Sequence, residues 1–222
     1  MGVEKSESFY DQKFSSELDY QNHYKNSWYY VHWTQIIKYL KKFDKPKLLE
    51  VGCGTGQLAE YLSDEGYQYY CGFDFSAKAI EIAKNRIDLD FFVGNALEKK
   101  SFEKEYNFII CTEVLEHIKD DYKVLNNIKA GSNIIFSVPN FDEESHVRWF
   151  LTERQIKKRY FRYIDIKDIT RVGNIYIVLG IRSNFNPNIL QTFFATRENI
   201  SINSFTVRLK HRIKNLLKIK RI

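Results

Sequence analysis

Three glycines at alternate positions follow a short apolar run, and this stretch constrains the fold more than any other part of the chain. The run covers residues 48–51, and the glycines are Gly52, Gly54 and Gly56. A short apolar run that ends in turn residues is typical of a buried strand, so we expect a strand, a tight turn and a helix over residues 57–63. Glycine permits backbone conformations that a Cβ forbids and lets a ligand approach closely. The turn is therefore predicted to hold a ligand.

The glycine spacing and a nearby carboxylate indicate the class of ligand. A dinucleotide site needs Gly-x-Gly-x-x-Gly, with the pyrophosphate at the helix N-terminus. Here Gly56 comes one residue early, and Gln57 stands where that pattern has its third glycine. Glu50 would also repel a pyrophosphate in a partly buried cleft. We therefore expect a cationic ligand without phosphate.

The segment 49–56, Leu-Glu-Val-Gly-Cys-Gly-Thr-Gly, resembles the first motif of the class I S-adenosylmethionine-dependent methyltransferases. Further matches in the expected order extend this resemblance over about residues 45–155. The resemblance implies a cofactor with a sulfonium and an ammonium group, and an α/β fold with a doubly wound, seven-stranded mixed sheet, similar to the Rossmann fold. The residues that it assigns to the cofactor are Glu50, Gly52, Cys53, Gly54, Gly56, Asp74, Phe75, Asn95, Ala96, Leu97 and Thr112.

The length predicts one α/β domain with two appendages. With 222 residues the chain is too short for two such domains and a long linker. We expect a helical cap over residues 1–45, a cofactor-binding domain over 46–185 and a C-terminal extension over 186–222. The three cysteines have neither metal-ligand nor disulfide spacing, and no apolar run is long enough to span a bilayer. These features predict a cytoplasmic protein.

Aromatic residues are concentrated in the predicted cap. Apolar residues recur at helical spacing over residues 24–42, and the lysines at its end suit the last turn of a helix. The aromatic side chains either pack the cap onto the domain or form a lid over the ligand. In the second interpretation Tyr24 and Tyr29 contact the acceptor substrate.

The strand predicted over residues 67–74 ends at Asp74. At this place in a doubly wound sheet, a carboxylate can accept hydrogen bonds from both ribose hydroxyls of the cofactor. The alternative is that Asp74 caps the helix predicted over residues 76–86, but Ser76 already suits that role. By resemblance Phe75 lies against the adenine, with ordinary packing as its alternative.

A third strand, predicted over residues 89–93, leads to Asn95. Similar methyltransferases usually have an Asp in this loop, which accepts a hydrogen bond from the adenine amino group. The amide oxygen of Asn95 can accept the same bond, and the backbone at Ala96 and Leu97 would contact the ring nitrogen. The alternative for Asn95 is a role in the turn alone.

The fourth strand, predicted over residues 106–112, leads to Glu113, Glu116 and His117. Ligands in open α/β sheets lie at the carboxyl ends of strands, so these side chains are predicted to be near the site of methyl transfer. Three interpretations remain open: ordinary helix positions, His117 as a general base for the acceptor hydroxyl, or a divalent metal site that also includes His146. The segment resembles ubiquinone-pathway O-methyltransferases and small-RNA 2′-hydroxyl methyltransferases, where related positions hold a metal. We predict His117 and Glu113 as catalytic residues.

The polar loop after the fifth predicted strand carries His146 and Arg148. In similar proteins loops at this edge hold the acceptor, so both residues are candidates for substrate binding, with a surface position as the alternative. Arg148 would suit a carboxylate or phosphate. A helix beginning at Thr152 and two strands over residues 161–170 and 172–182 are predicted to complete the sheet.

Residues 207–222 carry most of the chain's net charge of +6, and their apolar residues recur near helical spacing. This basic amphipathic helix would bind nucleic acid, a membrane surface or an acidic partner, or dock on the domain. We predict a methyltransferase that moves a methyl group from S-adenosylmethionine to an oxygen or nitrogen of a small molecule. The alternatives are an RNA methyltransferase, a nicotinamide-dependent oxidoreductase and a non-catalytic cofactor-binding module.

Overall fold

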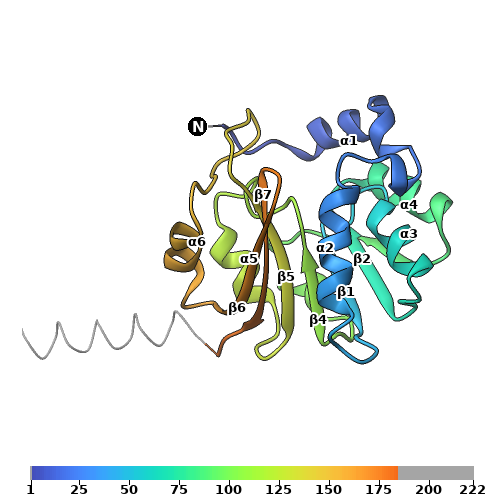
Figure 1. The fold of residues 1–222 in the computed structure, drawn as a ribbon. Helices are drawn as coiled ribbons and strands as arrows, with labels where there is room; N and C mark the ends of the chain where they lie inside the picture. The colour runs from blue at the N-terminus through green and yellow to red at the C-terminus, as the bar shows by residue number, and fades with distance from the viewer. Residues whose placement is uncertain (1, 185–222) are drawn as a thin grey trace, which may run out of the picture. The chain divides into compact units, whose positions relative to one another are not determined.

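The computed structural model describes residues 2–184. The predicted extension over 186–222, with its basic helix over 207–222, lies outside the described residues. A seven-stranded sheet has the order β3-β2-β1-β4-β5-β7-β6, and the predicted mixed sheet is confirmed (Figure 1). Its strands are β1 (Leu48–Val51), β2 (Tyr70–Asp74), β3 (Asp90–Val93), β4 (Phe108–Cys111), β5 (Asn133–Pro139), β6 (Ile164–Val172) and β7 (Ile175–Arg182). The α-helices are α1 (Glu7–Ser16), α2 (Tyr30–Leu40), α3 (Gln57–Asp64), α4 (Ala77–Arg86), α5 (Asp121–Asn127) and α6 (Glu153–Tyr160).

Strand β1 lies near the middle of the sheet between β2 and β4. Strands β1 to β5 run parallel, and β7 pairs antiparallel with both β5 and β6. Both β1 and β4 are fully buried, which explains their short apolar sequences. From β1 the chain builds the sheet first toward β3 and then toward β5. The carboxyl end of β1 is therefore at the switch point where ligands bind in this class of sheet.

Helices cover both faces of the sheet. Residues of α2, α3 and α4 share one apolar core with the strands, and Ile135 of β5 belongs to it. The next residue, Phe136, faces the opposite way and packs on Tyr160 of α6. Helix α5 is joined to α6 because Asp121 accepts hydrogen bonds from Arg159 and Tyr160. Among residues 2–184, no helix combines the length and the apolar character needed to cross a membrane.

The N-terminal cap differs in detail from the prediction. The single helix predicted over residues 24–42 is instead a short 3-10 helix, η2 (Tyr24–Asn26), followed by α2. Ser27 between them is extended, and its hydroxyl accepts a hydrogen bond from the Tyr29 N–H, so the first turn ends before α2 begins. The periodicity did not reveal α1 as a separate helix, because the apolar residues in this mostly polar segment are few.

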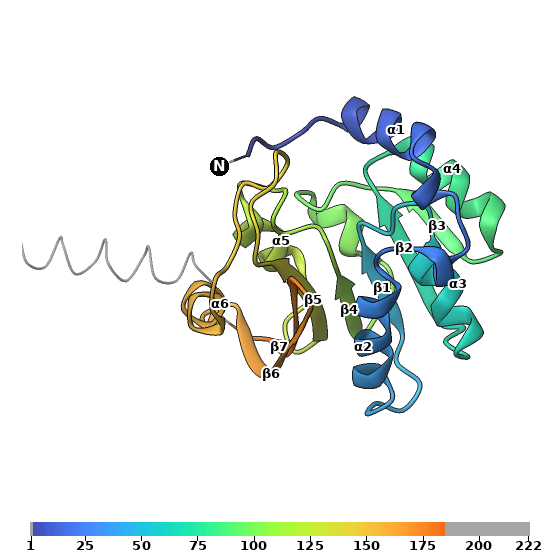
Figure 2. The same ribbon diagram turned by 45° about the horizontal axis from the view of Figure 1, so that its top comes forward.

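The cap is fixed to the domain by hydrogen bonds around the glycine turn. The Thr55 hydroxyl donates to the backbone oxygen of Tyr20, and the Gln57 amide donates to the backbone oxygens of Asp19 and Asn22. The carboxylate of Asp11 accepts a hydrogen bond from the hydroxyl of Ser76, which caps α4. Helix α1 accordingly lies beside α4 and crosses one end of the sheet (Figures 1 and 2).

Candidate active site

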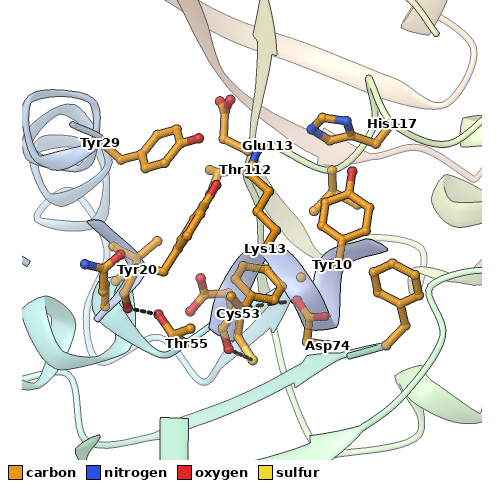
Figure 3. Close-up of a pocket in the computed structure, with 18 of the residues that line it drawn as sticks. Tyr10, Lys13, Tyr20, Tyr29, Cys53, Thr55, Asp74, Thr112, Glu113 and His117 are labelled. Atoms are coloured by element: carbon orange, nitrogen blue, oxygen red, sulfur yellow. Dashed lines mark hydrogen bonds between the residues drawn. The ribbon is translucent and has the colours of Figure 1, made fainter. Parts of the chain in front are cut away.

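A cavity of about 1280 Å³ lies at the carboxyl ends of the central strands, beneath the cap. Its walls come from the glycine turn, the ends of β2 and β4, the loops after β3 and β5, and the cap (Figure 3). Of the predicted cofactor residues, those that line it are Glu50, Gly52, Cys53, Gly54, Asp74, Phe75, Asn95, Ala96, Leu97 and Thr112. The chain thus brings residues from four strand ends to one space, as the order of motifs predicted.

The glycine turn is closed by its own hydrogen bonds. The backbone N–H groups of Gly52 and Cys53 both donate to the carbonyl oxygen of Phe73, at 2.8 and 3.0 Å, and the Gly54 N–H donates to the Asp74 carboxylate at 3.0 Å. Gly52 has φ = +72°, and a Cβ there would lie 2.4 Å from a methyl carbon of Val114. A glycine is required at this position for both reasons. The turn permits close approach of a ligand, and the N–H groups of Gly52, Cys53 and Gly54 are engaged within the fold.

Gly56 does not line the cavity, which corrects its assignment to the cofactor. It precedes α3 with φ = +77°, and a Cβ at this position would lie 3.1 Å from the Cβ of Ala83 in α4. The glycine is needed for the turn into α3 and for close packing of the turn on α4, because any side chain would force these elements apart.

Glu50 points from β1 into the buried floor of the cavity. Its side chain is buried, and its carboxyl group accepts a hydrogen bond from the hydroxyl of Tyr70. Burial raises the pKa of Glu50 to about 8, and the Asp74 charge adds to this. A cationic group in the cavity would favour the ionised carboxylate. A phosphate would be repelled by it.

Asp74 occupies the predicted position at the end of β2. One carboxylate oxygen accepts the Gly54 N–H, and the other accepts the Ser76 N–H at 2.9 Å. Burial raises the pKa of Asp74 to about 6, although these hydrogen bonds oppose the shift. Asp74 therefore stays largely ionised at neutral pH and can accept hydrogen bonds from a ligand in the cavity. Ser76 caps α4, as the sequence predicted.

The loop after β3 forms the far wall of the cavity. Asn95, Ala96 and Leu97 all line it, and Phe75 lies nearby at the end of β2. The side-chain oxygen of Asn95 accepts a hydrogen bond from the Leu97 N–H at 2.8 Å. Asn95 therefore shapes the turn, and the remaining lone pair of that oxygen and its amide N–H groups stay available to a ligand.

The segment after β4 forms an irregular turn, so its interpretation as ordinary helix positions was wrong. Glu113 has φ = +55°, in the left-handed region that ends a strand abruptly. Its N–H donates to the Ser137 hydroxyl at 2.8 Å, and that hydroxyl donates to the Glu113 carboxylate at 2.7 Å. Burial raises the pKa of Glu113 to about 7. The strain and the paired hydrogen bonds hold Glu113 at the cavity wall.

Glu116, His117 and His146 lie together beside the cavity. One ligand atom of each lies within 4.8 Å of the others. The Nδ1 atom of His117 is 3.0 Å from the carbonyl oxygen of Ser145, and the Nδ1 atom of His146 is 3.3 Å from that of Phe141. Since a carbonyl only accepts, Nδ1 carries a proton in both rings. The Nε2 atom of His146 lies 3.4 Å from the carboxylate of Glu143.

Burial shifts the pKa values of His117 and Glu116. It lowers the pKa of His117 to about 4, so the ring is neutral at neutral pH. Neither carboxylate oxygen of Glu116 has a hydrogen-bond partner among the described residues, and burial together with Glu113 raises the pKa of Glu116 well above its usual value. Burial of a carboxyl group without a hydrogen-bond partner costs free energy, unless a ligand or an ion binds to it.

Two predicted substrate residues lie away from the cavity. Arg148 donates hydrogen bonds to the backbone oxygens of residues 115, 118 and 119 and lies 3.5 Å from Asp121, so it holds the turn after β4 in place. Tyr24 is 2% exposed, and its hydroxyl donates to Asp64 at the end of α3. Both are structural residues, whereas His146 and Tyr29 line the cavity as predicted.

Several residues of the cap that were not predicted as site residues line the cavity, among them Tyr10, Lys13 and Tyr20. Tyr10 and Lys13 project from α1, and Tyr20 follows it (Figure 3). The Tyr10 ring packs against Phe75, and its buried hydroxyl has no hydrogen-bond partner among the described residues. Tyr10 and Lys13 are three residues apart, so both lie on one face of a helix. This spacing is the sequence feature from which their shared position could have been predicted.

Known proteins resemble this chain over most of the described range. The family model of a methyltransferase domain matches residues 24–173. The ubiquinone biosynthesis O-methyltransferase of Hydrogenovibrio crunogenus is 23% identical over 173 residues, which are 69% of this chain and 71% of that protein. The protein of the same name from Erwinia tasmaniensis is 28% identical over 141 residues, 58% of this chain and 57% of that protein. Magnesium protoporphyrin IX methyltransferase of Synechocystis, a structure with bound S-adenosylmethionine, has a TM-score of 0.58 and 16% identity, with 80% of this chain and 97% of that one covered.

The residues around the cavity fit this cofactor. The buried carboxyl groups of Glu50 and Asp74 suit its positive charges and its ribose hydroxyls. The match to the family model also decides against a nicotinamide-dependent oxidoreductase. The chain belongs to the methyltransferase domain family and is a class I S-adenosylmethionine-dependent methyltransferase.

Proposed function

We propose that the protein methylates a hydroxyl oxygen of a small molecule, and that Glu116, His117 and His146 hold a divalent cation at the acceptor. The observation that carries this proposal is the buried carboxyl group of Glu116, which has no hydrogen-bond partner among the described residues and lies beside two histidines whose Nδ1 atoms face backbone carbonyls. Metal-bound histidines usually donate their other ring N–H to a carbonyl or carboxylate, which is the arrangement of both rings here. The names of the relatives add support, because they are O-methyltransferases.

A bound divalent cation lowers the pKa of a coordinated hydroxyl and fixes its oxygen. The protein's own residues then have to align two reactants. The methyl group leaves the sulfonium sulfur, which keeps the electron pair of the broken bond, as the acceptor oxygen forms the new carbon–oxygen bond, and the hydroxyl proton passes to water. Because the sulfonium is already activated, alignment and exclusion of water supply most of the acceleration, about 7–11 kcal/mol in favourable cases. Tyr10 and Tyr29 of the cap cover the cavity and serve this purpose.

Chelator-treated protein tests the proposal, with catechol as the probe acceptor and release of S-adenosylhomocysteine as the readout. We expect activity to be lost on chelation and restored by Mg²⁺. Glu116→Gln should bind Mg²⁺ at least tenfold more weakly by calorimetry, because a neutral amide replaces a charged ligand. Glu144→Gln is the control. Glu144 belongs to the same loop as His146, but its side chain is exposed and pairs with Lys5.

Three results would contradict the proposal. Activity that survives exhaustive chelation would exclude the metal. Methylation of aromatic amines in place of hydroxyls would indicate nitrogen as the acceptor atom. Turnover of RNA but of no small hydroxyl compound would favour the RNA methyltransferase, the alternative that the basic residues 207–222 suggest.

A further inference from the structure

The cofactor carries a carboxylate as well as its two positive charges, and this carboxylate needs a partner in the cavity. The acids on the cavity floor, Glu50 and Asp74, suit the ammonium and the ribose, but they repel a carboxylate. An ionised carboxylate taken from water without a hydrogen-bonding partner is strongly disfavoured. Some donor near the glycine turn must therefore face the aminoacyl end of the cofactor.

Several donors of the turn are already used within the fold. The N–H groups of Gly52, Cys53 and Gly54 are engaged, as described above. The side chains of Thr55 and Gln57 donate to backbone oxygens of the cap. The turn also has no cationic side chain, so a charged donor has to come from an element that covers it.

Lys13 is in the right place and has the right charge. Helix α1 brings the next residue, Phe14, to within 3.7 Å of the position that a Cβ of Gly54 would have. The Lys13 side chain enters the cavity above Cys53, between Tyr20 and Tyr10 (Figure 3). Among residues 2–184 Lys13 has no ion-pair partner within 4 Å, whereas Lys5, which also lines the cavity, pairs with Glu144.

The surroundings keep Lys13 protonated. Burial lowers the pKa of its amine, but the combined influence of Tyr20, Glu17 and Glu143 outweighs burial and raises the pKa overall. The amine also lies 5.8 Å from the centre of the Tyr20 ring, and the Tyr20 hydroxyl can donate a hydrogen bond to the same ligand group. A charged amine beside a phenol is a suitable site for a carboxylate.

We propose that Lys13, assisted by Tyr20, binds the carboxylate of S-adenosylmethionine, so that the N-terminal cap is part of the cofactor site. The inference depends on the cofactor and not on the proposed O-methylation. It gives the cap a defined purpose: α1 is held over the turn by Asp11 and Phe14 and presents the cation that the turn lacks. A bound cofactor would in return hold the cap closed, because each stabilises the other.

Calorimetry with two ligands tests this inference without any acceptor. S-adenosylhomocysteine has the carboxylate, and its decarboxylated analogue differs by that group alone. Lys13→Met should weaken binding of S-adenosylhomocysteine by about 10–100-fold, because a charged hydrogen bond is lost, and should leave binding of the analogue within about twofold. Lys13→Arg should retain most of the affinity. Lys5→Met is the matched control and should change neither ligand.

Two outcomes would overturn the inference. Equal weakening of both ligands by Lys13→Met would mean that Lys13 only supports the cap, and thermal unfolding of the free variant would then show a loss of stability. Unchanged binding of both ligands would mean that the carboxylate has another partner. Either result would leave the metal-dependence experiment with catechol unaffected, so failure of this inference is distinct from failure of the proposed function.

Discussion

Cofactor binding should release a proton at neutral pH, and Glu50 should supply it. Burial raises the pKa of Glu50 to about 8, so only about one-tenth of these side chains are ionised at pH 7 in the free protein. The ammonium of the cofactor should lower this pKa by about 1–3 units, because a nearby opposite charge favours the carboxylate. Glu50 would then be about half to almost fully ionised in the complex. The expected release is about 0.4–0.9 protons per bound ligand.

Asp74 contributes little to this release. Its pKa is about 6, so it is already about nine-tenths ionised at pH 7 and can supply at most about 0.1 proton. Calorimetric titration with S-adenosylhomocysteine at pH 7 measures the release, since the observed enthalpy changes with the ionisation enthalpy of the buffer. The slope of that dependence is the number of protons.

Glu50→Gln is the decisive variant for this prediction. It keeps the shape of the side chain and an oxygen that accepts the hydrogen bond from Tyr70, but it has no proton to lose. The slope should fall to about 0.1 in this variant. A wild-type enthalpy that does not depend on the buffer, or a Glu50→Gln slope equal to that of the wild type, would refute the reasoning.

Three further predictions concern the turn and its supports. Affinity for S-adenosylhomocysteine should fall up to tenfold per pH unit below pH 6 as Asp74 gains a proton, and Asp74→Asn should abolish that dependence. Gly52→Ala should lower the unfolding free energy by about 2–4 kcal/mol in chemical denaturation, because its φ of +72° is unfavourable for alanine and the new Cβ would overlap Val114. Gly66→Ala should lower it by only about 1–2 kcal/mol, because Gly66 has φ = +89° but open space around it. Arg148→Met should lower the unfolding free energy by about 3 kcal/mol, yet change the affinity for S-adenosylhomocysteine by less than threefold. A loss of affinity without a loss of stability would show that Arg148 contacts the ligand.

The sheet and the cofactor motifs could be predicted because they depend on local patterns. A buried parallel strand needs a continuous apolar run, and a tight turn beneath a ligand needs glycine, so residues 48–56 identified both. Asp74 followed from its place at the end of the next strand. Once the order of the strands is known, these local features are enough to locate the cofactor site.

The roles of Tyr24 and Arg148 could not be predicted, because they depend on contacts between distant segments. Tyr24 hydrogen-bonds to Asp64, 40 residues away, and Arg148 holds backbone oxygens about 30 residues before it. An aromatic or cationic side chain near a site has the same sequence signal whether it faces the ligand or supports the wall. Helix α1 was missed for a related reason, since the domain beneath it supplies most of its apolar contacts.

The first half of the glycine turn is fixed by the neighbouring strand. The N–H groups of Gly52 and Cys53 donate to the carbonyl oxygen of Phe73, and the N–H of Gly54 donates to Asp74, so these three groups do not bind a ligand. Replacement of Asp74 would free the Gly54 N–H alone, because the other two are held by backbone of β2, which no side-chain substitution removes. The pairing of β1 with β2 thus fixes this part of the turn beneath the ligand, and Lys13 of the cap adds a cation that the acids of the cavity floor do not supply.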